Sequence, residues 1–411
     1  MISNKKIAKN TSMLLLLNIA KMLFPFITLP YLTRVLSVDK YGVVAYIKAV
    51  MNYMQIYIDF GFMLSATKRI VDCSTNSTKH GKVIGETLLS KVILAIPGGA
   101  FLVIFSNTNN ILKDNLSYVL ISYLAVLSSI FLFDFYYRGI EKMELITIRF
   151  ITMKLISTIA TLIYVKSDKD ILLIPIFDLL SSLIAVSMVF IDLKKSGVRI
   201  VITGLKGALC SLRESAIYFI SSIATTAFSA FITIILGITL NAADVAYWSI
   251  CMQITNAVQA MYTPISDAIY PEMIKYKNIK IVIKILKLFV PIIFVGCVVM
   301  FLGAKVFLFI LGGKKYVGAE LVLKMLVPVM FFGFLSIIFG WPTLGAIDKN
   351  KETTITTLIA AIFQVGIIIL LIIENKFTLI NIAISRSLTE IIFFLCRWYV
   401  FKKYRKLFNY D

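Results

Sequence analysis

Twelve long apolar runs dominate this sequence, and each has the length that a helix needs to cross a lipid bilayer. About 20 apolar residues in a helix cover roughly 30 Å of hydrocarbon. The runs are rich in Leu, Ile, Val and Phe and lack the alternation typical of membrane β-strands. They predict an all-α integral membrane protein with twelve transmembrane helices. The predicted spans are residues 11–33, 41–64, 83–105, 116–137, 147–165, 171–191, 214–239, 245–270, 283–311, 319–343, 354–373 and 377–400.

The composition excludes the other broad classes. Of the 411 residues, 59% are hydrophobic and 16% are charged, whereas soluble domains carry roughly 45–50% apolar and about 25% charged residues. A water-soluble fold, a disordered chain and a disulfide scaffold are therefore ruled out. No soluble basic domain is present, so the formal net charge of +20 does not indicate nucleic-acid binding.

Lysine and arginine are distributed unevenly between the loops. With the N-terminus inside, most of the basic loop residues fall on the cytoplasmic side, as the positive-inside rule requires. We therefore expect both termini to be cytoplasmic. The basic inner loops would lie against an anionic leaflet.

The longest inner connection divides the chain into two halves. We expect an N-terminal six-helix lobe over residues 1–192, a connector over 193–213 and a C-terminal six-helix lobe over 214–411. The connector is basic and partly apolar, which predicts an amphipathic helix at the cytoplasmic membrane surface. Because each lobe has an even number of spans, the lobes would share one orientation, as in parallel-repeat transporters.

The second span of each lobe carries a polar stripe at helical spacing. A matching stripe in both lobes favours an internal repeat. The stripes are Lys48, Asn52, Gln55 and Asp59 in the second span, and Asn256, Gln259, Thr263 and Asp267 in the eighth. The seventh span adds Ser222, Thr225, Ser229 and Thr233, which equally fit close helix packing.

Two lysines lie deep in their spans. A charge at the bilayer centre costs about 2.5–3.5 kcal/mol, so it normally faces a cavity or a partner. Lys21, one turn after Asn18, and Lys48 are too deep to reach the interface easily, and we expect both to face a water-filled cavity. Such a cationic cavity suits an anionic ligand, with phosphate the obvious candidate. For Lys91 and Lys154 we expect snorkelling to the interface, and for Arg386 and Glu390 a structural pair.

The sequence lacks the common catalytic motifs. It has no GxxxxGK[ST] loop and no HExxH or His/Cys cluster, so we expect no ATPase, no metal site and no cofactor. The sole histidine, His80, falls in a predicted cytoplasmic loop and should be solvated. Transport energy would then come from an ion gradient (H⁺ or Na⁺), the membrane potential or downhill substrate flow.

Several short motifs resemble one known family. They are LPYLTRVL at 29–36 with YG at 41–42, YIDFGF at 57–62 with SAT at 65–67, and YP at 270–271. These motifs resemble those of the bacterial polysaccharide (O-antigen and capsule repeat-unit) flippases of the multidrug/oligosaccharidyl-lipid/polysaccharide exporter superfamily. The resemblance implies a MATE-like architecture: two six-helix lobes around a central cavity lined by the first, second, seventh and eighth spans.

The resemblance also implies a substrate and a location. The substrate would be an undecaprenyl-diphosphate-linked oligosaccharide, moved to the outer leaflet of the bacterial cytoplasmic (inner) membrane by alternating access. Arg34 best matches the family's cavity cations and joins Lys21 and Lys48 as an expected diphosphate-binding residue. Asp59 and Asp267 would gate the cavity or bind the coupling ion, with Lys68 or Arg69 as ion-pair partners.

Two rival functions remain open at this point. An ion-coupled multidrug antiporter of the same superfamily would want an acidic cavity, which the lysines disfavour. A membrane-embedded polysaccharide polymerase would need a sizeable outer loop or a surface cluster of catalytic residues, and neither is visible.

Overall fold

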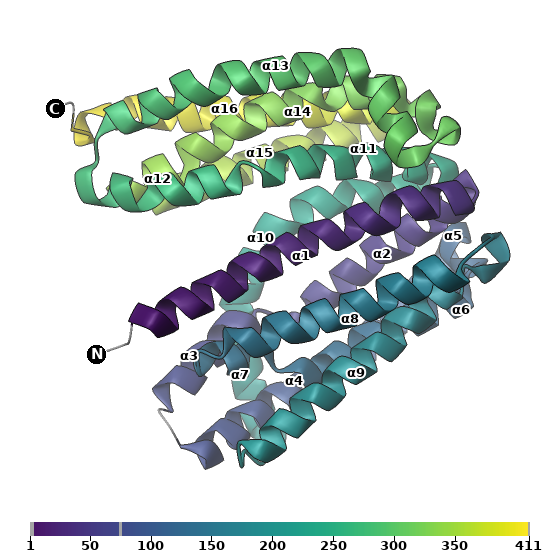
Figure 1. Cartoon of the computed structure of the whole chain (residues 1–411), viewed down its shortest axis with the longest axis vertical. Coiled ribbons are helices and arrows are strands. Elements are labelled where there is room, and N and C mark those ends of the chain that lie inside the picture. The colour runs from purple at the N-terminus through teal and green to yellow at the C-terminus, as the bar shows by residue number, and fades with distance from the viewer. Residues whose placement is uncertain (1–3, 74–75, 410–411) are drawn as a thin grey trace. The chain divides into compact units, whose positions relative to one another are not determined.

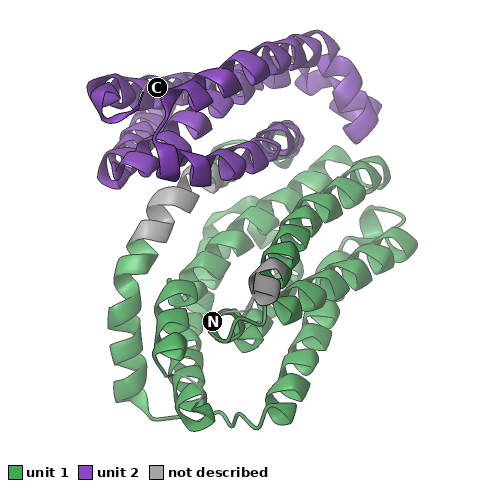
Figure 2. Cartoon of the chain, turned by 60° about the vertical axis from the view of Figure 1, so that its left-hand side comes forward, with its two compact units in different colours: residues 1–245 green, residues 246–411 purple. Residues whose placement is uncertain are grey.

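A computed structural model describes residues 4–73 and 76–409, apart from the side chains of 4–8 and 221–230. The chain divides into two compact units, Met1–Val245 and Ala246–Asp411, coloured separately in Figure 2. The unit boundary falls after the expected connector over 193–213. Each unit is described by itself.

The first unit is a helical bundle (Figure 1). Within it, α8 lies between α1 and α9 and packs against both. Its elements are α1 (Asn4–Val35), α2 (Val38–Asp59), α3 (Phe62–Asp72), α4 (Ser77–Thr108), α5 (Asn110–Lys113), α6 (Leu116–Ser128), η1 (Ser129–Leu132), α7 (Asp134–Gly139), α8 (Met143–Tyr164), η2 (Asp168–Asp170), α9 (Leu173–Lys195) and α10 (Leu205–Thr239).

The second unit begins within α11 (Ala242–Ala260) and is also helical. In it, α16 packs against both α14 and α15. The remaining elements are α12 (Thr263–Tyr276), α13 (Ile279–Gly312), η3 (Lys314–Ala319), α14 (Glu320–Ile338), η4 (Phe339–Leu344), η5 (Gly345–Ile347), α15 (Asn350–Ile373), α16 (Leu379–Lys403) and η6 (Arg405–Leu407).

The predicted spans coincide with helices, so the all-helical membrane fold is confirmed. Among the described residues, nine helices are long and apolar enough to cross a membrane. The predicted second, seventh and eighth spans are not among these nine; the second and eighth carry the polar stripes. The count of twelve crossings and the side of the termini stay predictions.

The second span is shorter than predicted because the backbone turns at its end. Phe60 and Gly61 both adopt left-handed conformations, with φ of 38° and 76°, and these separate α2 from α3. A Cβ on Gly61 would come within 2.8 Å of the Phe219 backbone nitrogen. A glycine is therefore needed here for both its φ and its size.

The connector differs from the predicted amphipathic helix. Its first residues end α9, residues 196–204 are irregular, and α10 begins at Leu205. The irregular segment lies on α4, where Val201 N donates to Gly81 O at 3.0 Å. A Cβ on Gly81 or Gly85 would overlap the backbone carbonyls of this segment. Two glycines one turn apart thus create a groove that only a side-chain-free helix face provides, and this long-range contact replaces the expected separate helix.

Candidate functional site

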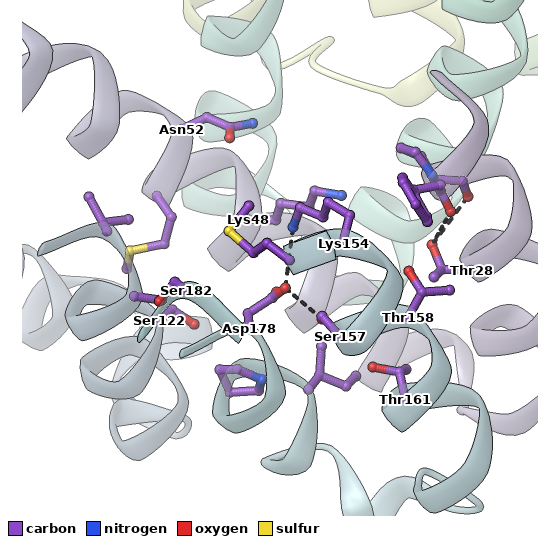
Figure 3. Close-up of a pocket in the computed structure, with 18 of the residues that line it drawn as sticks. Thr28, Lys48, Asn52, Ser122, Lys154, Ser157, Thr158, Thr161, Asp178 and Ser182 are labelled. Atoms are coloured by element: carbon purple, nitrogen blue, oxygen red, sulfur yellow. Dashed lines mark hydrogen bonds and ion pairs between the residues drawn. The ribbon is translucent and has the colours of Figure 1, made fainter. Parts of the chain in front are cut away.

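A cavity of about 450 Å³ lies within the first unit, among α1, α2, α6, α8 and α9 (Figure 3). Four of the residues expected at the site line it: Lys21 from α1, and Lys48, Asn52 and Gln55 from α2. The α2 stripe therefore faces this cavity along most of its length. Small polar side chains complete the wall: Thr28, Ser122, Ser129, Ser157, Thr158, Thr161 and Ser182.

The two deep lysines differ in their partners. The Lys21 ammonium lies 5.8 Å from the ring centroid of Phe150, within range of a cation–π contact. Lys48 makes no hydrogen bond or ion pair within the part of the chain that the structure describes. A cation without a fixed partner in a polar cavity is available to a ligand.

Two charged residues of this cavity were not predicted from the sequence. Lys154 from α8 and Asp178 from α9 form an ion pair with Nζ and Oδ1 3.2 Å apart, and Ser157 Oγ donates to the same Oδ1 at 2.7 Å (Figure 3). Snorkelling was expected for Lys154; instead its side chain turns into the bundle. The signal that was available is the run of Ser157, Thr158 and Thr161, which marks the polar face of α8 that also carries Lys154.

The cavity is cationic. Its lining holds three lysines, Lys21, Lys48 and Lys154, against one carboxylate, Asp178. The formal surplus is two positive charges. Because the three ammonium groups are gathered around one cavity, their charges add and this surplus attracts an anion.

The last residue of the α2 stripe, Asp59, lies beyond the cavity lining. Its Oδ1 pairs with Lys91 Nζ at 2.7 Å, and its Oδ2 accepts from Gln55 Nε2 at 2.9 Å. Ser129 Oγ donates to Gln55 Oε1 at 3.0 Å, so both polar atoms of this amide are engaged. A hydrogen-bonded chain thus runs from Lys91 to the cavity wall.

The expected partners of Asp59 lie elsewhere. Arg69 forms an ion pair with Glu86 of α4, and its Nε lies 3.9 Å from Glu214 of α10. Lys68 is exposed on α3. The pairing of Asp59 with Lys68 or Arg69 is therefore replaced by the pair with Lys91, which also corrects the snorkelling expected for Lys91.

Two further residues of α1 that were expected at the site, Arg34 and Asn18, lie away from Lys21 and the cavity. Arg34 is exposed in the last turn of α1, Asn18 is exposed earlier in the same helix, and neither lines the cavity. Of the three expected diphosphate-binding cations, the structure therefore brings together Lys21 and Lys48.

The stripe expected in the eighth span is divided between two helices. Asn256 and Gln259 lie in α11, and Thr263 and Asp267 lie in α12. Gln259 Nε2 donates to Val329 O at 3.2 Å, while the other three residues are exposed. The four residues do not share one continuous helical face. In the seventh-span stripe, the side chains of Ser222, Thr225 and Ser229 lie outside the described residues.

Arg386, Glu390 and His80 are buried among the helices and do not line the cavity. Arg386 and Glu390 pair at 2.9 Å with both side chains buried, as the structural reading of that pair predicted. His80 is buried in α4 against the ring of Tyr136, not solvated in a loop. Across residues 4–73 and 76–409 there is no group of three or more His, Cys, Asp or Glu side chains that would hold a metal ion.

Comparisons with known proteins agree on one family. A family profile described as "Polysaccharide biosynthesis protein" matches residues 7–277. The protein named "Putative O-antigen transporter" from Escherichia coli (strain K12) is 29% identical over 380 residues, which is 90% of each chain. A protein of the same name from Shigella dysenteriae is 28% identical over 280 residues, covering 66% of this chain and 68% of its own.

Solved structures share the fold. The lipid II flippase MurJ in an inward closed conformation superposes with a TM-score of 0.75, at 15% identity, over 94% of this chain and 87% of that one. An inward-facing multidrug resistance MATE family transporter of the MOP superfamily superposes with a TM-score of 0.69, at 14% identity, over 93% and 96% of the two chains. At these identities the likeness establishes the fold alone.

Proposed function

The chain belongs to the family of polysaccharide biosynthesis proteins, and on that premise we propose that it is a flippase for lipid-linked oligosaccharides. Its substrate would be an undecaprenyl-diphosphate-linked repeat unit, moved from the cytoplasmic to the outer leaflet of the bacterial inner membrane for O-antigen, capsule or other surface polysaccharide. The multi-pass helical fold and the O-antigen transporter relatives support this proposal. The protein is a transporter rather than an enzyme.

The cationic cavity is the observation that carries the proposal. A diphosphate cannot enter hydrocarbon unpaired because desolvating its charges costs far more than transport can supply. Lys48 and Lys154, with Lys21 in the same cavity, provide ammonium groups that would replace the water around the phosphate oxygens. Asn52 and the serine and threonine hydroxyls of the wall would hydrogen-bond the first sugar.

The cavity size fits a headgroup rather than the whole substrate. About 450 Å³ lies within the range of roughly 300–1,000 Å³ that is typical of small-ligand sites. The long prenyl chain would stay in the bilayer, and distal sugars would extend beyond the cavity. Alternating access then needs to shelter only the charged centre of the molecule.

Gating and energy coupling belong to the same proposal. Asp59 is the last residue of α2, where it pairs with Lys91 and hydrogen-bonds to Gln55 of the cavity wall. Through these contacts, ligand binding in the cavity would be coupled to the conformation at this end of α2. Asp267 would serve the second unit as a gating or ion-coupling residue. The coupling ion would be H⁺ or Na⁺.

The rival functions predict different cavities and phenotypes. A multidrug antiporter shares this fold, but a cavity with three lysines and one aspartate does not favour organic cations. A polymerase would act on repeat units already at the outer surface, so its loss would leave short surface sugars. Loss of a flippase leaves none.

A deletion strain tests the proposal. We expect the full lipid-linked repeat unit to accumulate on the cytoplasmic leaflet, with no surface polysaccharide. Complementation with Lys48→Ala should fail, whereas Lys113→Ala, which removes an exposed lysine of α5 outside the cavity, should restore export. Short surface sugars in the deletion strain would point to a polymerase, and intact polysaccharide with lost drug efflux would point to an antiporter.

A further inference from the structure

The Lys154–Asp178 pair is open to the cavity, whereas the Arg386–Glu390 pair of α16 is closed. The side chains of Lys154 and Asp178 are 35% and 40% exposed, whereas those of Arg386 and Glu390 are 8% and 6% exposed. An entering anion can therefore reach the Lys154 ammonium without first opening the bundle.

Asp178 is surrounded by cations and hydroxyls from three other helices. Lys154 and Ser157 of α8 both contact Oδ1, and no hydrogen bond or ion pair of Oδ2 is found in the described part of the chain. Lys48 of α2 and the buried Tyr118 of α6 lie within electrostatic range of the carboxylate. Asp178 is the single anion of the lining, so it alone offsets the cavity lysines.

The charge balance of the cavity matches one form of diphosphate. Three lysines and one aspartate leave a formal surplus of two positive charges. A diphosphate esterified at both ends, as in a sugar-loaded lipid carrier, has two negative charges. A diphosphate esterified at one end, the bare carrier, has close to three at pH values above about 7, because the last proton of a terminal phosphate dissociates with a pKa of about 6.

We infer that Asp178 is a specificity-determining residue, which sets the cavity charge so that the sugar-loaded diphosphate diester is preferred over the bare diphosphate monoester. This inference rests on the proposed function and adds to it a rule for discrimination. With the diester bound, the cavity is formally neutral. With the monoester bound, it holds one uncompensated negative charge, which makes that complex less favourable.

Such a preference would keep the protein from binding the bare carrier at the outer leaflet after transport. Removal of the glycan leaves the bare carrier at the outer leaflet, where it would compete with loaded carrier for the cavity. A repulsive carboxylate inside the cavity rejects that competitor without any contact to the sugar. The protein then distinguishes loaded from bare carrier partly by the charge of the diphosphate, because the carboxylate disfavours binding of the bare carrier.

Binding of two synthetic probes to the purified full-length protein tests the inference. The probes are farnesyl diphosphate and its methyl ester, which differ in charge but carry no sugar. At pH 8, we expect the wild type to bind the methyl ester about tenfold more tightly, as an order of magnitude for one unpaired charge. At pH 5.5, where the monoester gains a proton, the preference should shrink toward none.

Variants separate charge from shape. Asp178→Asn keeps the size of the side chain but raises the surplus to three charges, so the preference at pH 8 should reverse toward farnesyl diphosphate. The double variant Asp178→Asn/Lys154→Gln returns the surplus to two charges, and it should recover the wild-type preference. Asp39→Asn, which removes an exposed carboxylate outside this cavity, should leave the ratio unchanged.

The outcomes distinguish this inference from the proposal beneath it. If the wild type binds neither probe, the diphosphate site itself is wrong. If it binds both probes and Asp178→Asn leaves their affinity ratio as in the wild type, the site stands and the role of Asp178 is overturned. A ratio that reverses in Asp178→Asn and recovers in the double variant supports the inference.

Discussion

Lys91 and Asp59 form an ion pair in which Nζ lies 2.7 Å from Oδ1, and the two side chains differ in burial. The Lys91 side chain is 9% exposed and that of Asp59 is 38% exposed. Asp59 also accepts from Gln55, which lines the cavity. The pair therefore anchors the end of α2 to α4 and fixes one wall of the cationic site.

This asymmetry predicts unequal effects of breaking the pair. Asp59→Asn leaves a buried ammonium without its counter-charge, whereas Lys91→Met leaves a carboxylate that is partly solvated. We expect Asp59→Asn to destabilise the protein by roughly 2 kcal/mol, below the 3–5 kcal/mol typical of fully buried pairs because of the exposed carboxylate. Lys91→Met should cost less. Thermal unfolding in detergent measures both, and equal losses would contradict the assignment.

The glycine groove of α4 predicts a second destabilisation. A Cβ on Gly85 would lie 2.0 Å from Val201 O, so Gly85→Ala forces the 196–204 segment away from the helix. We expect a loss of about 1–3 kcal/mol, typical of overpacking, and faster proteolysis within that segment. Gly366→Ala is the matched control, since a Cβ there meets nothing within 4 Å. Identical digestion of both variants would argue against the contact.

The buried pair of α16 predicts a non-additive double variant. Arg386→Met strands Glu390 and should cost about 3–5 kcal/mol, whereas Arg386→Met/Glu390→Leu removes both charges and should recover much of the loss. Both single and double variants should retain the pH dependence of probe binding, because these residues lie in the second unit and do not line the cavity. A double variant less stable than Arg386→Met would show that the pair contributes more than mutual neutralisation.

The predicted topology has its own test. In a cysteine-free background, Lys113→Cys should react with a membrane-impermeant maleimide in intact cells, since it falls in a predicted outer loop. Lys206→Cys, on the predicted cytoplasmic side, should react only after permeabilisation. The reverse pattern would invert the orientation, and with it the direction of transport.

The sequence predicted site residues well where a charged residue lies deep within an apolar run. Lys21 and Lys48 were predicted for a cavity because charges deep in apolar runs need one, and the structure places both in its lining. Lys154 and Asp178 were missed because each lies nearer a span end, where an interface explains a charge equally well. Their pairing depends on how α8 packs against α9, and the sequence pattern within one helix does not predict its contacts with another helix.

The remaining differences have the same origin. His80 stands in a polar stretch, yet α4 begins before it and buries it against Tyr136. The connector has an amphipathic pattern, but the groove at Gly81 and Gly85, far upstream in the sequence, determines where residues 199–202 lie. Apolar length predicts helices well because each helix satisfies its own backbone. The tertiary contacts of a residue cannot be predicted from this local pattern.

The most direct test of the account is flipping by the purified protein in liposomes. A fluorescent prenyl-diphosphate oligosaccharide is placed in one leaflet, and its appearance in the other is followed by an impermeant quencher. We predict that wild type and Lys113→Ala transfer the lipid at similar rates, that Lys48→Arg retains part of the rate, and that Lys21→Ala/Lys48→Ala/Lys154→Ala abolishes transfer. Transfer at the wild-type rate by the correctly folded triple variant would contradict the claim that these ammonium groups carry the diphosphate through the membrane.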